Sequence, residues 1–186
     1  MPTLIMLAGS NGAGKSTFYE SFLKDKSLPF INADNLAKEL NLDPYEAARM
    51  ALDIREQMVS QSMSFISETV FSDPVGDKVS FLEKAAHAGY QVTLIFIGIE
   101  SVDLSRERVA SRVRAGGHDV PAEKLQQRYT RTLRNLSQAI TTLPRVILFD
   151  NSQFDKPFRF GSEYRNGKCH KKGEEPTPNW ASAVML

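Results

Sequence analysis

The chain has 186 residues and a formal net charge of +1, with a single cysteine, Cys169. This length suits one domain, and we expect a single domain over residues 1–186, with its core in 1–151 and a C-terminal hairpin and tail in 152–186. The near-neutral charge argues against a general nucleic-acid or membrane-surface binder. The lone cysteine excludes an internal disulfide and favours a reducing, cytoplasmic setting, and no apolar run approaches the roughly 20 residues that span a bilayer.

The first third of the chain predicts two strands and two helices. The continuous apolar run Thr3–Ala8 predicts a central parallel strand buried on both faces, and a glycine-rich loop follows it. We expect a helix over about 15–23 and a second strand over 28–32. Asp43-Pro44-Tyr45-Glu46 then has the cap, the first-turn proline and the third-position acid of a helix start, and apolar residues at helical spacing continue this helix to about residue 61.

The rest of the core alternates in the same way. We predict strands over 64–71, 92–99 and 146–149, and helices from a cap at Asp73-Pro74 to Gly89, over 104–114, and from Pro121 to about 140. Such alternation implies right-handed crossovers and a mostly parallel sheet of five strands with helices on both faces.

The tail has a different pattern. Two short segments, 158–164 and 168–172, flank Asn166-Gly167, which is a strong signal for a β-hairpin turn. Residues 173–179 are rich in proline and charge, so we expect a loosely held segment there.

The loop after the first strand carries the main chemical signal. It fits G-x-x-x-x-G-K-[ST], in which backbone N–H groups cup phosphates, the lysine adds charge on the β- and γ-phosphates, and the hydroxyl coordinates magnesium. The preceding strand and following helix are the context that this mechanism requires. We therefore expect a P-loop NTPase fold that binds ATP and Mg²⁺, with Ser16 on the metal. The predicted nucleotide-binding residues are Gly9, Ser10, Asn11, Gly12, Ala13, Gly14, Lys15, Ser16 and Thr17.

A phosphate loop does not by itself name a reaction. The L-S-G-G-Q signature of ABC-type ATPases is missing, and so is the N-K-x-D element with which GTPases read guanine. These absences favour a kinase.

Carboxylates near the predicted strand ends provide an acceptor side. Asp34 follows the second strand and Glu68 lies near the end of the third, where ligands gather in such sheets. A kinase needs a carboxylate to orient a hydroxyl and accept its proton, so Asp34 is the candidate base, with Glu68 and Thr69 as acceptor-binding groups. The alternatives are an ordinary helix cap at Asp34 and a solvated acid at Glu68.

Basic residues dominate the stretch from 106 to 134. Arg108 and Arg112 are four apart, so one helix face presents both, and we expect them to stabilise the transferring phosphoryl group, whereas other arginines there form a solvated face. Gly116-Gly117 is a candidate hinge and His118 either touches phosphate or caps the next helix. Asn151, after the last core strand, either contacts the adenine or forms a simple turn.

Several of these segments together resemble the zeta toxin family of P-loop kinases, particularly its short bacterial members. The resemblance covers roughly residues 3–151. Its most specific parts are Asn-x-Asp after the second strand, Glu-Thr on the third, and Arg-Val-x-x-Gly-Gly-His-x-Val-Pro before the last long helix. It also includes the phosphate loop and Arg128-Tyr129.

The resemblance implies ATP-dependent phosphorylation of a hydroxyl on a UDP-linked N-acetylated amino sugar, with Asp34 as the base and Glu68 as the acid that contacts the sugar. It also implies a possible antitoxin protein as partner. Three alternatives remain open. The first is a metabolic sugar or small-molecule kinase without a toxic role, and the second is an ATP-regulated RNA-binding module that uses the arginine-rich face. A phosphate loop that binds nucleotide without chemistry is a third.

Overall fold

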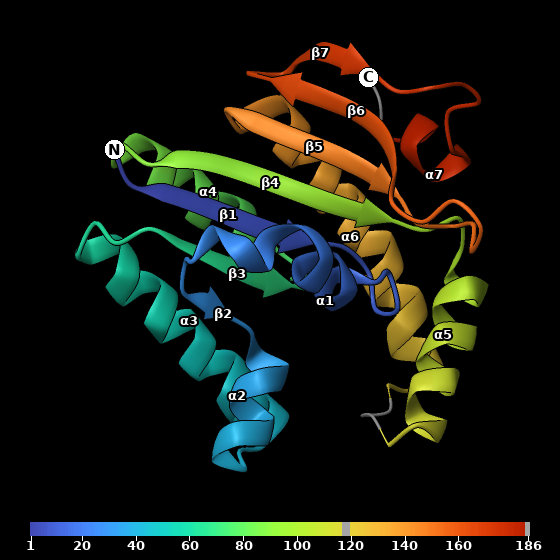
Figure 1. Cartoon of the computed structure of the whole chain (residues 1–186), viewed down its shortest axis with the longest axis horizontal. Coiled ribbons are helices and arrows are strands. Elements are labelled where there is room, and N and C mark those ends of the chain that lie inside the picture. Colours follow the sequence, from blue (N-terminus) through green and yellow to red (C-terminus); the bar gives the residue numbers. More distant parts are fainter. Residues whose placement is uncertain (117–119, 185–186) are drawn as a thin grey trace.

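One seven-stranded sheet organises the molecule (Figure 1). The structure, a computed structural model, describes residues 1–116 and 120–184. The strand order is β2-β3-β1-β4-β5-β6-β7; the first five strands are parallel, and β6 and β7 add to the β5 edge as an antiparallel hairpin. The strands are β1 Thr3–Ala8, β2 Phe30–Ile31, β3 Phe65–Thr69, β4 Gln91–Gly98, β5 Arg145–Asp150, β6 Arg159–Arg165 and β7 Lys168–Lys172. The predicted five-stranded parallel sheet and the hairpin are confirmed, and the hairpin extends the same sheet.

Helices cover both faces of this sheet. Alternate residues of β1 divide between two apolar clusters, because successive side chains of a strand point to opposite faces. Leu4 and Met6 pack with α3, α4 and α6, whereas Ile5 and Leu7 pack with α1 and the turn after it. The helices are α1 Lys15–Phe18, α2 Ala33–Leu40, α3 Pro44–Ser60, α4 Asp77–His87, α5 Val102–Arg114, α6 Ala122–Thr142 and α7 Asn179–Ser182.

Local signals placed several helices correctly. Asp43 and Glu46 form the predicted capping box at the start of α3, with Pro44 at its first position. The first predicted helix is shorter as an α-helix than expected, because α1 passes into a π-helical turn over Tyr19–Leu23 and a 3-10 turn over Lys24–Lys26.

The end of one strand and the start of one helix differ from the predicted positions, each for a local reason. The second strand ends at Ile31 because the side chain of Asn32 accepts hydrogen bonds from the next backbone N–H groups and starts α2. The helix expected at Asp73-Pro74 begins at Asp77, with Gly76 at its N-cap. The Asp73 carboxylate still accepts from the backbone N of Asp77, at 2.6 Å.

Specific contacts hold the chain within and just after the segment 173–179, for which we expected a loose arrangement. Trp180 on α7 is 3% exposed, packs against Phe96 of β4 and donates its indole N–H to Asp150 Oδ1 at 2.9 Å. Arg159 donates to the backbone oxygens of Glu174 and Pro176. The guanidinium of Arg159 therefore holds the backbone within 173–179, and the indole of Trp180 binds the residues just after this segment to the sheet.

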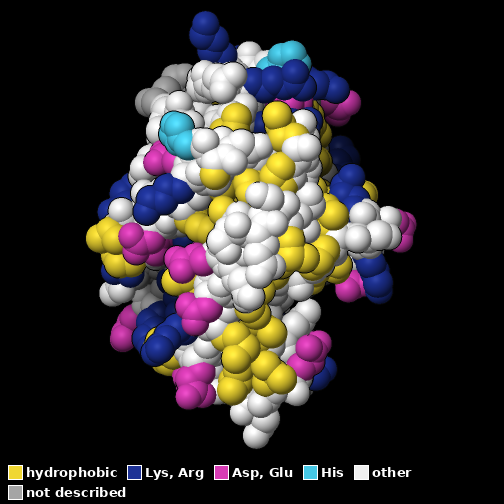
Figure 2. Space-filling model, turned by 90° about the vertical axis from the view of Figure 1, so that its left-hand side faces the viewer, with side chains coloured by type: hydrophobic (Ala, Val, Ile, Leu, Met, Phe, Trp, Pro, Cys, Tyr) yellow, Lys and Arg dark blue, Asp and Glu magenta, His cyan; other side chains and the backbone are white. Residues whose placement is uncertain are grey.

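The outer surface near α2 and α3 mixes charged and apolar side chains. Leu40 and Leu52 are 52% and 43% exposed, and Figure 2 shows hydrophobic side chains gathered toward the bottom of this face. No helix in the part of the chain that the structure describes is both long and apolar enough to cross a bilayer.

Candidate functional site

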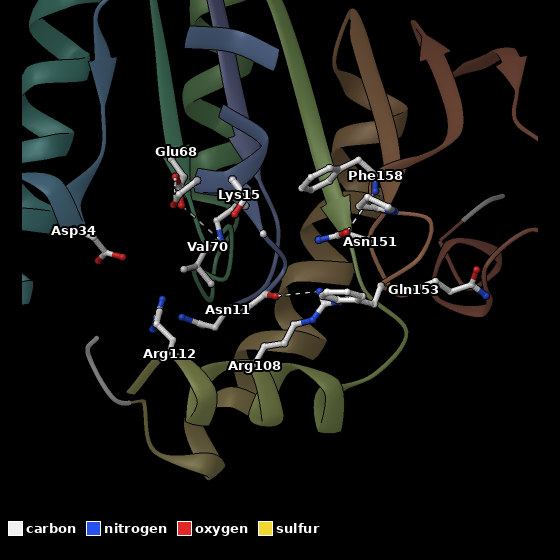
Figure 3. A pocket seen from close by; sticks show the side chains of 16 residues that line it. Asn11, Lys15, Asp34, Glu68, Val70, Arg108, Arg112, Asn151, Gln153 and Phe158 are labelled. Atoms are coloured by element: carbon white, nitrogen blue, oxygen red, sulfur yellow. Dashed lines mark hydrogen bonds and ion pairs between the residues drawn. The ribbon is translucent and has the colours of Figure 1, made fainter. Parts of the chain in front are cut away.

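A cavity of about 590 Å³ lies where the parallel strands end at their carboxyl side (Figure 3). This is the position at which ligands bind in such sheets. Four segments line it: the phosphate loop, the acids after β2 and on β3, the arginines of α5, and the loop after β5. Its lining residues are Asn11, Gly12, Gly14, Lys15, Ser16, Thr17, Asp34, Glu68, Val70, Arg108, Arg112, Asn151, Gln153, Phe154, Pro157 and Phe158.

The phosphate loop lies tightly against the sheet. Gly9 passes so close to the carbonyl oxygen of Ile97 that a Cβ atom would collide with it, and Gly14 adopts a left-handed φ of 91° at the start of α1. These conformations explain why glycine is required at both positions. Ser10 and Ala13 are buried residues of the loop, and neither these two residues nor Gly9 lines the cavity.

Lys15 is a buried cation at the centre of the cavity wall. Its ammonium donates to the backbone oxygen of Ser10 at 3.0 Å and lies 4.0 Å from Glu68 Oε1. Burial lowers the pKa of Lys15, and the neighbouring carboxylates of Glu68 and Asp34 partly oppose this effect. A bound phosphate would supply the negative charge that this desolvated ammonium needs.

Glu68 connects three parts of the site. Its Oε2 accepts from Ser16 Oγ at 3.0 Å and from Asn32 Nδ2 at 2.8 Å, so the carboxylate joins β3 to the loop and to the start of α2. The alternative interpretation of Glu68 as a solvated acid is therefore wrong, because its carboxylate accepts both of these hydrogen bonds. The hydroxyl and the carboxylate together are oxygen donors of the kind that magnesium prefers.

Asp34 lies in the first turn of α2 with its carboxylate facing the cavity, opposite Arg112 (Figure 3). Asn32, and not Asp34, is the cap of this helix: its Oδ1 accepts from the backbone N of Asp34 at 2.7 Å and of Asn35 at 3.1 Å. The cap interpretation of Asp34 is therefore wrong, and its carboxylate remains directed at the cavity. Sequence reasoning assigned no role to Asn32, although a polar residue between a strand and a helix is a usual capping signal.

Thr69 does not line the cavity. Its hydroxyl instead accepts from the backbone N of Phe71 at 3.4 Å, whereas Val70, which sequence reasoning missed, lines the cavity beside Glu68. Glu68 and Thr69 are consecutive residues of β3, so their side chains point to opposite faces. This alternation was available from the sequence.

Arg108 and Arg112 both line the cavity from α5, one helical turn apart, as their spacing predicts. Arg108 donates to the backbone oxygen of Gly12 at 3.3 Å, and Ser105 Oγ donates to that of Asn11 at 2.7 Å, so α5 lies directly against the phosphate loop. Burial lowers the pKa of Arg108, and Asp150 opposes this shift. Gly116 follows α5 with φ 88°, whereas Gly117 and His118 lie outside the described residues.

Asn151 joins the last core strand to the phosphate loop. Its Nδ2 donates to the backbone oxygen of Ala13 at 2.9 Å and its Oδ1 accepts from the backbone N of Phe158 at 3.4 Å. Both ends of the amide are thus engaged by the protein. Gln153 and Phe154 lie beyond it in the cavity lining, and the Phe154 ring is 98% exposed. The aromatic residues that follow the last core strand were the sequence signal that could have identified this part of the cavity lining.

Comparisons with known proteins agree with this geometry. The family model described as Zeta toxin matches residues 1–156. A Haemophilus influenzae protein of uncharacterised function is 30% identical over 130 residues, which are 67% of this chain and 91% of that protein.

Solved structures show the same fold at low identity. A chain of the AvrRxo1-ORF1:ORF2 complex matches with a TM-score of 0.73 and 17% identity, over 100% of this chain and 64% of that one. A structure of that complex with ATP matches with a TM-score of 0.68 and 17% identity, over 92% and 60%. The PezAT toxin–antitoxin system of Streptococcus pneumoniae gives 0.61 and 18%, over 100% and 77%. The chain thus spans about three fifths of the AvrRxo1 chains that it matches.

Proposed function

Because this chain belongs to the zeta toxin family of P-loop phosphotransferases, we propose that it transfers the γ-phosphoryl group of ATP to a hydroxyl of a UDP-linked N-acetylated amino sugar. The observation that carries this proposal is that one cavity holds both the phosphate loop with buried Lys15 and, across from it, the carboxylate of Asp34. A nucleotide end and a base end in one cavity are what phosphoryl transfer to an alcohol requires.

At the nucleotide end, the residues Gly9 to Thr17 would hold the phosphates, with Lys15 on the β- and γ-phosphates. The AvrRxo1 complex determined with ATP supports nucleotide binding by this fold. Ser16 Oγ, which lies 3.0 Å from the Glu68 carboxylate, would be the protein group on a magnesium ion, which neutralises phosphate charge when bound.

At the acceptor end, Asp34 would accept the proton of the sugar hydroxyl as its oxygen bonds to the γ-phosphorus and the bond to the bridging oxygen of ADP breaks. Glu68 is held by Asn32 and Ser16 and would orient the sugar. Arg108 and Arg112, aligned on one face of α5, would stabilise the negative charge on the transferring oxygens.

The neighbours also support a partner protein. Both the PezAT and the AvrRxo1 structures are toxin–antitoxin or two-protein assemblies, so we propose that a separate antitoxin inhibits this enzyme in the cytoplasm, where ATP is available.

Phosphorus NMR tests the reaction directly. Wild-type protein with ATP, magnesium and a panel of UDP-sugars and free sugars should give a new phosphomonoester signal with a UDP-linked N-acetylated amino sugar. Asp34→Ala should abolish the signal yet retain ATP binding, since a positioned base contributes about 10²–10⁴-fold. Asp53→Ala, an exposed acid on α3, is the matched control and should behave as wild type.

Two outcomes would contradict the proposal. Wild-type turnover in Asp34→Ala would exclude it as the base, and transfer only to free sugars would favour a metabolic kinase. Induced expression in a bacterium separates the same alternatives, because growth arrest that depends on Lys15 and Asp34 indicates a toxin.

A further inference from the structure

The last short helix, α7, lies outside the part of the chain that the family model matches. That match ends at residue 156, whereas α7 carries Trp180, which is the only tryptophan of the chain. Trp180 is buried although it belongs to the C-terminal tail, and it does not line the cavity. The proposed reaction therefore gives this large side chain no direct role.

Trp180 contacts the carboxyl ends of two neighbouring strands. Its Nε1 donates to Oδ1 of Asp150, the last residue of β5, at 2.9 Å. Its ring lies so close to Gly98, the last residue of β4, that a Cβ atom at that position would collide with it. The carboxyl ends of parallel strands border the ligand site. The indole thus lies directly behind the residues from which two segments of the cavity wall begin.

A continuous set of hydrogen bonds leads from these strand ends to the phosphate loop. Asn151 follows Asp150 directly, and its backbone N–H donates to the oxygen of Gly98 at 2.9 Å. The side-chain Nδ2 of Asn151 donates to the backbone oxygen of Ala13 in the phosphate loop, also at 2.9 Å. The same short segment is therefore held by the indole at Asp150 and supports the phosphate loop at Asn151.

Two further contacts bind the tail to the same region. Arg159 Nη2 lies 3.7 Å from Asp150 Oδ2 and donates to the backbone oxygen of Pro176 at 3.0 Å. Asn179 Nδ2 donates to Oε1 of Glu100, in the connection from β4 to α5, at 2.9 Å. The tail is thus fixed to the end of β5 and to the segment that leads into the helix with the two cavity arginines.

We propose that Trp180 is a positioning residue for the nucleotide: its hydrogen bond fixes Asp150 and Asn151, and Asn151 holds the phosphate loop in the conformation that binds ATP. Backbone N–H groups bind phosphate strongly only when they already converge on it, because ordering a loose loop during binding costs free energy. The inference rests on the proposed kinase function and adds the C-terminal helix to the elements that build the nucleotide site.

Titration of the whole chain with a fluorescent ATP analogue and magnesium tests this role. Trp180→Phe keeps an aromatic ring but removes the donor, and it should weaken nucleotide binding about tenfold, the factor that one hydrogen bond can contribute. Tyr90→Phe is the matched control. The Tyr90 hydroxyl is a donor to the backbone oxygen of Met58 at 2.9 Å, and Tyr90 precedes β4 at the end opposite Gly98. This control should lose stability and retain the wild-type affinity.

A pair of substitutions at Asp150 tests the same hydrogen bond from the other partner. Asp150→Asn and Asp150→Ala both remove the carboxylate charge, but only Asp150→Asn keeps an oxygen that can accept from the indole N–H. Asp150→Asn should therefore bind the nucleotide more tightly than Asp150→Ala. This pair decides the question if Trp180→Phe fails to fold in a thermal unfolding scan.

The outcomes separate the inference from the proposed function. Failure of the wild-type protein to bind the nucleotide would overturn the kinase proposal and this inference with it. Wild-type binding with an unchanged affinity in Trp180→Phe would overturn the positioning role alone. An equal loss of affinity in Tyr90→Phe would do the same, because it would show a general effect of lower stability. Equal affinities of the two Asp150 variants would also contradict the role of the indole hydrogen bond.

Discussion

Asn32 performs two separable tasks with one side chain, and substitution can resolve them. Its oxygen caps α2 by accepting from the backbone N–H groups of Asp34 and Asn35, at 2.7 and 3.1 Å. Its Nδ2 donates to Glu68 Oε2 at 2.8 Å, and the side chain is buried, with the residue 5% exposed. One amide therefore positions both the proposed base and the acid proposed to bind the acceptor.

Two variants of Asn32 should lose different amounts of unfolding free energy. Asn32→Ser retains a good capping oxygen but is too short to reach Glu68, so it should lose the hydrogen bond to a charged acceptor, about 1.5–3 kcal/mol of unfolding free energy. Asn32→Ala loses the cap as well, which adds about 0.5–2 kcal/mol. Transfer should fall in both variants, and more in Asn32→Ala, because only there does the first turn that holds Asp34 lose its cap.

Urea unfolding at equilibrium measures the stabilities, and phosphoryl transfer measured by phosphorus NMR gives the activities. A wild-type unfolding free energy in Asn32→Ser would refute the importance of the bond to Glu68. Equal stability of Asn32→Ala and Asn32→Ser would refute the capping role.

Three further substitutions test the C-terminal tail and the phosphate loop. Trp180→Phe should lower the unfolding free energy by about 1–3 kcal/mol, read by denaturant titration, because the indole N–H no longer donates to Asp150. Gly14→Ala should weaken ATP binding at least tenfold in a fluorescent-nucleotide titration, since φ is 91° and the new Cβ would meet Asn151 Nδ2 at 2.5 Å. Lys15→Met should raise the melting temperature of nucleotide-free protein at pH 7. Because the folded pKa of Lys15 is below its ordinary value of 10.5, this gain should shrink as pH rises toward 10.5, and a gain that grows with pH would contradict it.

The sequence by itself determined the features that depend on neighbouring residues. Thr3–Ala8 is a strand, Asp43 and Glu46 form the capping box, and Asn166-Gly167 turns the hairpin, all as predicted. Gly9 to Ser16 predicted the phosphate loop. In each case the steric limits on φ and ψ and the hydrogen bonds of adjacent residues decide the local structure, so a short window of sequence carries the information.

Only the tertiary structure decided which distant groups meet. Glu68 reaches Ser16 because β3 pairs with β1 in a register that aligns Glu68 with Leu7, at the end of the strand that leads into the loop. Asn151 reaches Ala13 across most of the chain, and Trp180 reaches Asp150 from just beyond the segment that was expected to be loose. Such contacts depend on strand order and register, which are set by burial of the whole sheet and leave no short-range signal. The phosphate loop could therefore be predicted from the sequence, whereas the residues that position it could be identified only from the fold.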